Sequence, residues 1–367
     1  MRKGWEYKTL GEICDIYQPK TISNEMLVKG GKYPVYGANG TIGFYNSYNH
    51  IESEILLTCR GATCGTINVS QPYSWINGNA MVIHRKSDYL DFKFLYFLMK
   101  SLDYSFIING AAQPQITRAR LAPLKVAIPP KYIQLSIVSE LDKLNELIRI
   151  KKEQLKDYDT LAQSIFYEMF GDPVENEKGW EVKKLKDISR KIGDGLHGTP
   201  EYSESDTGWY FINGNNLENG CISIKSTTKK VTDSVRKKYY VEMDDFTLLV
   251  SINGTLGKSA FYNGENVILG KSACYIKLNK DVNKLFIYEI IRGEYFKLYA
   301  ESVCTGTTIR NVSLKAMREF PIIYPPLSLQ HSFTQKIEQI EQQKAAIQKT
   351  ITDLETLLAA RMQYWFD

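Results

Sequence analysis

The stretch KYIQLSIVSELDKLNELIRIKKEQLKDYDTLAQSIFYEMF, residues 131–170, decides the fold because it contains no glycine or proline. Its apolar side chains alternate at spacings of four and three residues, as in a coiled-coil seam, and Lys151 fills the one remaining seam position. The seam residues are Ile137, Leu141, Leu144, Ile148, Leu155, Tyr158, Ala162, Ile165 and Met169. This pattern predicts one long helix that begins after Pro129-Pro130 and ends at Gly171.

A second stretch with the same pattern begins at Tyr324, where YPPLSLQHSF follows the layout of IPPKYIQLSI from Ile128. The pairs that match at one constant offset include Pro129 with Pro325, Gln134 with Gln330, Leu141 with Ile337 and Phe170 with Phe366. The second seam consists of Phe333, Ile337, Ile340, Lys344, Ile347, Ile351, Leu354, Leu358, Arg361 and Trp365. Each helix therefore holds a lysine near the middle of its seam. This lysine either meets an aliphatic partner and reaches outward to solvent, or its stem runs along the seam edge.

The beginning of the chain is also repeated, since GWEYKTLGEI at 4–13 returns as GWEVKKLKDI at 179–188. Between each opening and its long helix lies a variable region rich in Val, Ile, Thr and Tyr and cut by Gly and Asn, which predicts short strands and tight turns. LLTCRGATCG at 56–65 aligns with LLVSINGTLG at 248–257, and one helical stretch is expected in each region, near 91–103 and 283–301. The sequence thus predicts two α+β domains, each attached to a long helix.

Composition is that of an ordinary globular chain, with 367 residues, 43% hydrophobic and 24% charged. The longest apolar runs are too short for a membrane helix and the N-terminus has no signal-peptide core, so we expect a cytoplasmic protein. The six cysteines form no C-x-x-C pair and the four histidines are scattered, so we expect no metal site and no cofactor. The net charge of +5 comes from the variable regions, which is a weak indication of phosphate binding.

Motifs for catalysis are missing from the sequence. The triplets Gly257-Lys258-Ser259 and Gly270-Lys271-Ser272 lack the earlier glycine of a P-loop, because Ile252 and Glu265 stand there. The two Pro-Pro pairs lack the preceding Asn or Asp of an amino-methyltransferase motif. No nucleophile with a base at a recognisable spacing and no carboxylate cluster is present, so we expect no enzyme activity.

Polar and basic loops are the remaining candidates for function. GAAQPQITRAR at 110–120 and GTTIRNVSLK at 306–315 lie at matching places in the two repeats, each ahead of a long helix. Amide side chains can pair with adenine, Arg with guanine, and Lys and Thr with phosphates, although solvated loops are the simpler interpretation of either stretch alone. The candidate DNA-binding residues are Lys32, Tyr36, Asn39, Arg60, Thr63, Gln113, Gln115, Thr117, Arg118, Arg120, Asn213, Asn215, Asn253, Lys258, Lys271, Thr307, Thr308, Arg310 and Asn311.

Taken together, these marks resemble the specificity (S) subunit of type I restriction-modification systems over the whole chain. They are the KGWE opening at 178–181, YGANGTIGFYN at 36–46, GATCG at 61–65, IPP and YPP followed by Gln, and MFGDP at 169–173. The chain departs from the family in having Ile133 and Leu329 where an acid often precedes the glutamine. The resemblance implies two target-recognition domains, at 1–130 and 172–323, and two antiparallel coiled-coil helices, at 131–171 and 324–367.

The same resemblance implies a non-catalytic protein that binds a bipartite site on double-stranded DNA. Its implied partners are two copies of a methyltransferase (M) subunit and, in the full complex, restriction (R) subunits. It also implies a circular arrangement of the repeats, so we expect the two chain ends to lie close together. Two alternatives remain open: an enzyme such as a fused methyltransferase, and a free-standing bipartite DNA-binding protein or coiled-coil scaffold.

Overall fold

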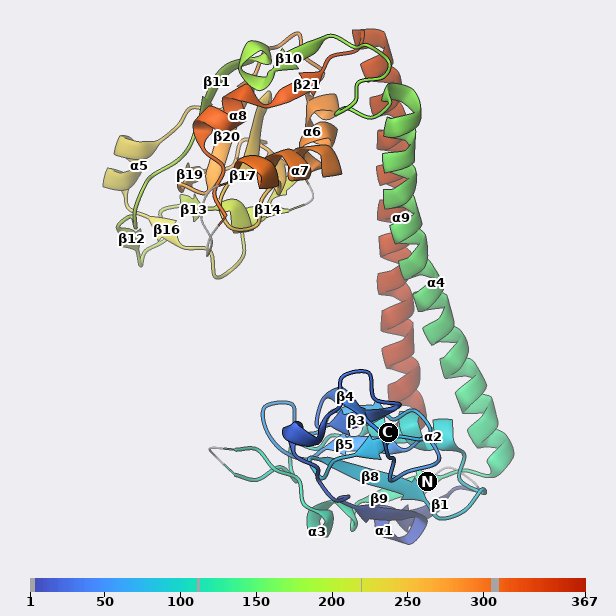
Figure 1. The fold of residues 1–367 in the computed structure, drawn as a ribbon. Coiled ribbons are helices and arrows are strands. Elements are labelled where there is room, and N and C mark those ends of the chain that lie inside the picture. The colour runs from blue at the N-terminus through green and yellow to red at the C-terminus, as the bar shows by residue number, and fades with distance from the viewer. Residues whose placement is uncertain (1–3, 111–112, 219, 305–309) are drawn as a thin grey trace. The chain divides into compact units, whose positions relative to one another are not determined.

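The computed structural model describes residues 4–110, 113–218, 220–304 and 310–367. The chain folds into two compact units (Figure 1). Unit 1 comprises Met1–Glu153 and Ile347–Asp367, and unit 2 comprises Gln154–Ala346. Each unit therefore contains one variable region and a part of both long helices.

Unit 1 is a mixed α and β structure, and it contains the first part of the long helix α4. Its elements are β1 (Glu6–Thr9), α1 (Leu10–Ile13), β2 (Cys14–Tyr17), η1 (Asn24–Met26), β3 (Tyr33–Gly37), β4 (Gly40–Tyr45), β5 (Ile55–Thr58), β6 (Ile67–Val69), β7 (Trp75–Ile76), β8 (Ala80–Arg85), α2 (Phe92–Ser101), α3 (Arg118–Leu121), β9 (Lys125–Ile128) and α4 (Lys131–Phe170). The prediction of short strands in the variable region is confirmed, for example by β3, β4, β5 and β6.

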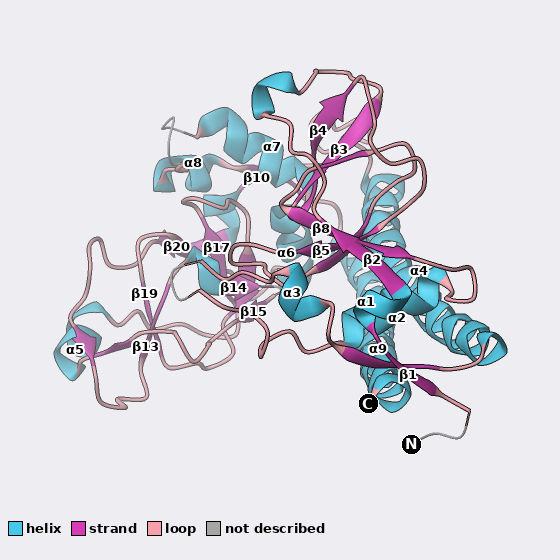
Figure 2. Cartoon of the chain, turned by 90° about the horizontal axis from the view of Figure 1, so that it is seen from below, coloured by secondary structure: helices cyan, strands magenta, loops and turns pink. Residues whose placement is uncertain are grey.

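The main sheet of unit 1 has the order β2-β8-β5-β6, and Figure 2 shows β2, β8 and β5 side by side. A second sheet, β4-β3-β7, includes the parallel pair β3–β7. Helix α2 begins at Asp91, whose carboxylate accepts hydrogen bonds from the backbone N–H groups of Lys93 and Phe94. Its buried side chains Phe94, Leu95 and Leu98 share one core with the main sheet. Burial of this apolar face stabilises the helix on the sheet.

Unit 2 repeats this plan with additional elements. They are β10 (Val182–Lys184), η2 (Leu185–Ile188), β11 (Ser189–Gly193), β12 (Tyr202–Ser203), β13 (Tyr210–Ile212), η3 (Gly214–Asn216), β14 (Leu217–Glu218), β15 (Cys221–Ile222), β16 (Lys230–Val231), α5 (Asp233–Tyr239), β17 (Thr247–Ser251), β18 (Ser259–Phe261), β19 (Val267–Leu269), β20 (Ala273–Leu278), α6 (Lys284–Arg292), α7 (Glu294–Val303), α8 (Leu314–Glu319), β21 (Pro321–Ile323) and α9 (Leu327–Phe366). Its sheets have the orders β11-β20-β17-β18 and β12-β16-β13-β19.

Strand pairing shows which residues of the two units are equivalent. The last residue of β5, Thr58, pairs with Ala80, and the last residue of β17, Ser251, pairs with Ala273. Leu56 is therefore equivalent to Leu249, and the sequence alignment of Leu56 with Leu248 was wrong by one residue. Two leucines in a row allow either register, and the shorter loop after β17 restores the alignment at the following glycines.

The expectation of a single helical stretch near 283–301 was also wrong. Two helices, α6 and α7, meet at Gly293, whose backbone is extended (φ −76°, ψ 168°). A glycine at the junction removes helix propensity at that point, and it separates α7 from the segment that matches α2.

Within unit 1, α4 and α9 pair in antiparallel fashion, because Glu140 contacts Arg361 while Lys152, further along α4, contacts Glu355 earlier in α9. Most of the buried positions are those of the predicted seam. They include Leu141, Leu144 and Ile148 on α4 and Ile351 on α9.

Within unit 2 the same two helices pair through Phe333, Ile337 and Ile340 on α9 and Ala162 on α4. Lys344 is half-buried, and its Nζ lies 2.8 Å from an oxygen of Asp159 on α4 and 3.0 Å from one of Glu341. This lysine therefore reaches outward to carboxylates. The coiled-coil prediction is confirmed in both units.

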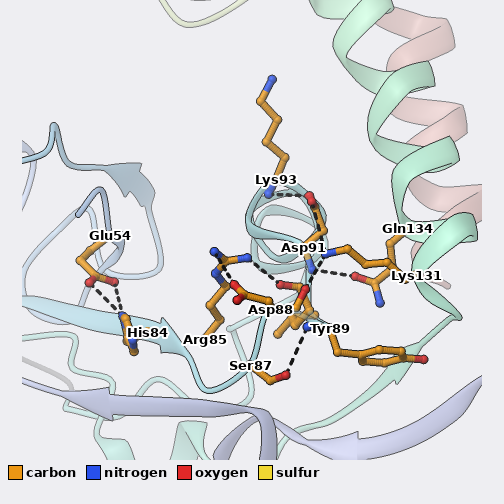
Figure 3. Close-up of polar contacts among 11 residues, drawn as sticks. Glu54, His84, Arg85, Ser87, Asp88, Tyr89, Asp91, Lys93, Lys131 and Gln134 are labelled. Atoms are coloured by element: carbon orange, nitrogen blue, oxygen red, sulfur yellow. Dashed lines mark hydrogen bonds and ion pairs between the residues drawn. The ribbon is translucent and has the colours of Figure 1, made fainter.

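The start of α4 is fixed to α2 by Gln134 (Figure 3). Its Nε2 donates to the carbonyl of Pro129 (2.9 Å) and its Oε1 accepts from the backbone N–H of Asp91 (2.8 Å). The equivalent Gln330 donates to the carbonyl of Pro325 (2.8 Å). The glutamine after each proline pair therefore acts as a helix-start anchor.

Both chain ends belong to unit 1 (Figure 1), where Trp5 and Phe366 pack against the same core. The rings of Phe366 and Phe94 lie 5.6 Å apart, and the equivalent rings of Phe170 and Phe286 in unit 2 lie 5.1 Å apart. The end of α9 thus closes unit 1 as the end of α4 closes unit 2. Among the described residues, no helix combines the length and apolar character needed to cross a membrane.

Candidate nucleic-acid interface

In unit 1 the loop after β5 pairs with the segment before α3. Arg60 and Gln115 form an isolated antiparallel bridge. The backbone N–H of Ile116 donates to the carbonyl of Cys59 (3.0 Å), and that of Gly61 donates to the carbonyl of Pro114 (3.0 Å). Two stretches that are far apart in sequence are thereby held side by side.

Two backbone hydrogen bonds join Asn109 to Gln115 (N···O 3.0 and 2.8 Å). Gly110 has φ +89°, and a Cβ there would lie 2.4 Å from the carbonyl oxygen of Gln113. Only glycine fits this position. Gln113, two residues before Gln115, is exposed.

Asn39, in the turn between β3 and β4, joins the same loop cluster. Its Oδ1 accepts a hydrogen bond from the Oγ1 of Thr63 (2.5 Å), and the hydroxyl of Thr58 donates to the carbonyl of Ala38. The structure thus brings together Asn39, Arg60, Thr63 and Gln115 as predicted candidates. We call this set of segments, 37–41, 59–65, 109–110 and 113–116, loop cluster 1.

Unit 2 has the equivalent arrangement. Asn253 and Asn311 form an antiparallel bridge, and the Nδ2 of Asn253 lies 3.3 Å from the Oδ1 of Asn311. The backbone N–H of Gly254 donates to the carbonyl of Arg310 (2.9 Å), and that of Val312 to the carbonyl of Ile252 (2.8 Å). We call the loops 213–216, 252–258, 270–272 and 310–313 loop cluster 2.

Ser272 is a supporting residue that the sequence analysis missed. Its hydroxyl accepts from the backbone N–H of Gly214 (3.0 Å) and donates to the Oδ1 of Asn213 (3.1 Å), and its carbonyl accepts from Ile252 N–H (3.1 Å). It lies in one of the Gly-Lys-Ser triplets, and the segment continues into strand β20, where a P-loop would continue into a helix. The triplet therefore forms the turn between β19 and β20.

Two predicted residues do not present their side chains in loop cluster 1. Tyr36 was predicted to bind DNA, but it is 6% exposed in the core beneath β3, and its hydroxyl accepts from the backbone N–H of Gln71 (3.0 Å). Its ring packs with Leu56, Ile76 and Val82 in a small core. Lys32 precedes β3, at the opposite end of the strand from Asn39, and lies over the ring of Tyr33 (5.2 Å).

The basic residues after Gln115 lie on a short helix, which the sequence analysis took for a loop. Arg118 and Arg120 are exposed on α3, and Thr117 is its N-terminal flanking residue. In unit 2, Arg310 is exposed but pairs with Glu301 (Nη1···Oε1 2.7 Å). Asn215 and Lys271 are exposed and Lys258 is half-buried. Thr307 and Thr308 lie outside the described residues.

The cysteines near loop cluster 1 show no sign of reactivity. Burial raises the pKa of the Cys59 and Cys64 thiols, which keeps them protonated at neutral pH. In the described part of the chain, no three His, Cys, Asp or Glu side chains gather as a possible metal site. The chemistry offered by both loop clusters is hydrogen bonding and positive charge.

Comparisons with known proteins agree with this geometry. The family model for the type I restriction modification DNA specificity domain matches residues 2–157 and 177–356. A putative type I specificity subunit from Mycoplasma pneumoniae is 24% identical over 89% of this chain and 86% of its own length. One from Haemophilus influenzae is 23% identical, over 92% and 87% respectively.

Solved structures share the fold at low sequence identity. The S subunit from M. genitalium covers 99% of this chain and 96% of its own, with a TM-score of 0.57 and 16% identity. A structure from work on complex assembly and conformational transition of the type I R-M system covers 99% and 97%, with a TM-score of 0.64 and 16% identity. Since the family model matches both repeats, this chain belongs to the family of type I restriction-modification DNA specificity domains.

Proposed function

We propose that this chain is the sequence-specific DNA-recognition subunit of a type I restriction-modification complex. It binds a bipartite target on double-stranded DNA and directs methyltransferase and restriction subunits to it. The observation that carries the proposal is the duplicated loop cluster, in which the same backbone bridge presents polar side chains in both units. Membership of the specificity family supports the same function.

In this proposal, residues 1–130 and 172–323 are the two target-recognition domains, and 131–171 and 324–367 are the conserved helices. Each recognition domain reads one half of the target through its loop cluster, with Arg, Asn and Gln at base edges and Lys and Thr at phosphates. The chain itself is non-catalytic and acts in the cytoplasm, where its methyltransferase partner performs the chemistry.

Loop exchange tests the recognition role. In the complex with its methyltransferase, replacing all the loops of cluster 1 with those of a relative should change one half of the methylated sequence and leave the other half unchanged. The readout is sequencing of methylated bases in the host genome. A change in both halves, or in neither, would contradict the proposal.

Two exposed leucines support a complex with two methyltransferase subunits. Leu161 on α4 and Leu357 on α9 match at the constant offset of the repeat, and they are 45% and 46% exposed. An exposed leucine at the same place in each copy is suited to docking one partner subunit per copy. Either residue therefore provides an independent test of one docking position.

Native mass spectrometry of the co-expressed complex should show two methyltransferase subunits for the parent and one for Leu161→Glu. The Leu161→Glu, Leu357→Glu double variant should retain none. Leu147→Glu is the matched control, because Leu147 is also 45% exposed on α4 but its repeat equivalent is Gln343. Loss of both subunits from Leu147→Glu would show that any charge on these helices disrupts assembly.

A further inference from the structure

The antiparallel bridge occupies the same structural position in the two units but carries different side chains. Arg60 lies two residues after Thr58, the end of β5, and Asn253 lies two residues after Ser251, the end of β17. Gln115 and Asn311 face them across the bridges. We call Arg60 with Gln115, and Asn253 with Asn311, the bridge pairs.

Backbone hydrogen bonds hold each bridge pair whatever its side chains are. Directly after the bridge residue come Gly61 (φ +88°) and Gly254 (φ +76°), and a Cβ on either would meet no atom within 4 Å. Their requirement for glycine is therefore conformational, since L side chains rarely adopt positive φ. Because the two backbone bonds on either side of the bridge are the same in both units, the side chains at the bridge are free to differ.

Within the described residues, the Asn253–Asn311 pair leaves one amide oxygen and one amide nitrogen without a hydrogen-bond partner. One amide N–H of Asn253 is directed to the oxygen of Asn311, which leaves the oxygen of Asn253 as an acceptor and the Nδ2 of Asn311 as a donor. If both amides were turned over, one amide oxygen and one amide nitrogen would still face away from the contact, the oxygen as an acceptor and the nitrogen as a donor. In the major groove, adenine presents one donor, N6, beside one acceptor, N7, whereas guanine presents two acceptors.

The Arg60–Gln115 pair differs, because the guanidinium of Arg60 offers only hydrogen-bond donors. Arg60 is exposed, and within the described residues no carboxylate pairs with it, whereas Arg310 in unit 2 is held by Glu301. A guanidinium offers two parallel donors, which match the O6 and N7 of guanine. Gln115 is half-buried, and both of its backbone groups are held by Asn109.

We propose that the bridge pair is a base-reading position in each unit, with Asn253 and Asn311 together reading an adenine and Arg60, beside Gln115, reading a guanine. This inference rests on the proposed function. It assigns the base at one position in each half of the target, and it explains why one backbone frame can serve two different sequences.

The test uses the complete chain in complex with its methyltransferase, acting on a library of DNA with randomised sequence. The double variant Asn253→Arg, Asn311→Gln gives unit 2 the bridge pair of unit 1. It should replace adenine by guanine at one position in one half-site, with a change in preference of about 5- to 150-fold, and leave the other half-site unchanged. Asn311→Ala, which keeps the backbone bridge, should relax the same position without a new preference.

Asn263→Ala is the matched control, because Asn263 is an exposed asparagine of unit 2 in the turn after β18, away from the bridge. It should keep the parent target. If Asn311→Ala and the double variant both methylate the parent target with parent preferences, the bridge pair does not read bases and the inference is wrong. If the parent complex shows no sequence preference at all, the proposed function is wrong, and the inference falls with it.

Discussion

Units 1 and 2 use the same strand order in their main sheets and the same bridge between loops, yet they close their cores differently. In unit 2, Phe170 at the end of α4 is fully buried and meets the rings of Phe166, Phe286 and Phe333 at 5.1–5.3 Å. In unit 1, the equivalent Phe366 is half-buried and lies 5.6 Å from the ring of Phe94.

The difference shows that the backbone plan of the repeat is carried by hydrogen bonds and strand pairing, while its stability depends on local packing. The residues equivalent to Phe333 and Phe166 in unit 1 are Ile137 and Met362. Four phenylalanines in one unit correspond to two in the other, and neither change affects the order of the strands.

The largest expected effect follows from this contrast. Phe170→Ala should destabilise unit 2 by about 3–5 kcal/mol, because it leaves a cavity among three aromatic rings. Phe366→Ala should destabilise unit 1 by only about 1–2 kcal/mol, because less of that ring is buried. Hydrogen exchange resolved by segment measures the two units separately. Equal losses of protection in the two variants would show that the two helix ends contribute equally to their cores.

A second difference between the units lies on α2 of unit 1 and the matching helix α6 of unit 2. Unit 1 has Phe97, buried in its core, where unit 2 has Glu289. Burial raises the pKa of Glu289 to about 7, although Arg292, with Nε 3.3 Å from the carboxylate, opposes this shift. Glu341 and Lys344 on α9 are the other charged groups that act on it.

The folded state of unit 2 therefore binds more protons at Glu289 than the unfolded state between about pH 4.5 and 7. Because the folded pKa is raised, the contribution of Glu289 to stability decreases as pH rises through that window and is constant above it. Glu289→Gln should flatten this dependence and stabilise unit 2 by roughly 1–3 kcal/mol at pH 8. The measurement is hydrogen exchange of α6 at pH 5 and pH 8. A variant less stable than the parent at pH 8 would mean that the ion pair with Arg292 outweighs the cost of burial.

The sequence predicted the long helices and the repeat well, because their signals are periodic and local. Of the predicted seam of α4, Ile137, Leu141, Leu144, Ile148 and Ala162 are buried and the other residues are half-buried, and proline pairs mark both helix starts. The register between repeats was less certain, because the neighbouring leucines Leu248 and Leu249 fit either alignment until strand pairing decides between them.

The candidate interface was predicted only in part, because loop function depends on contacts between segments far apart in sequence. Arg60 and Gln115 were both selected as candidates, but no pattern in the sequence shows that they face each other. Tyr36 was a candidate because it opens the stretch YGANGTIGFYN, but it is a core residue. Ser272 was overlooked because its role comes from three hydrogen bonds to other loops.

The smallest expected effect distinguishes the two anchoring glutamines. Gln134 uses both ends of its amide, whereas the Oε1 of Gln330 is buried without a hydrogen-bond partner among the described residues. Replacement by methionine keeps the volume and removes the hydrogen bonds, so Gln134→Met should cost about 2 kcal/mol and Gln330→Met about 1 kcal/mol. Part of the second loss is offset because an unpaired buried oxygen is removed.

Chemical denaturation, with exchange at α2 reporting on unit 1 and exchange at α6 reporting on unit 2, measures this difference. Gln134→Met should also speed exchange of the Asp91 N–H, since that group loses its acceptor. If Gln330→Met were as costly as Gln134→Met, the oxygen of Gln330 must gain a partner in solution. In that case the two helix starts would be anchored equally, and the contrast between the units would be limited to their aromatic closure and to Glu289.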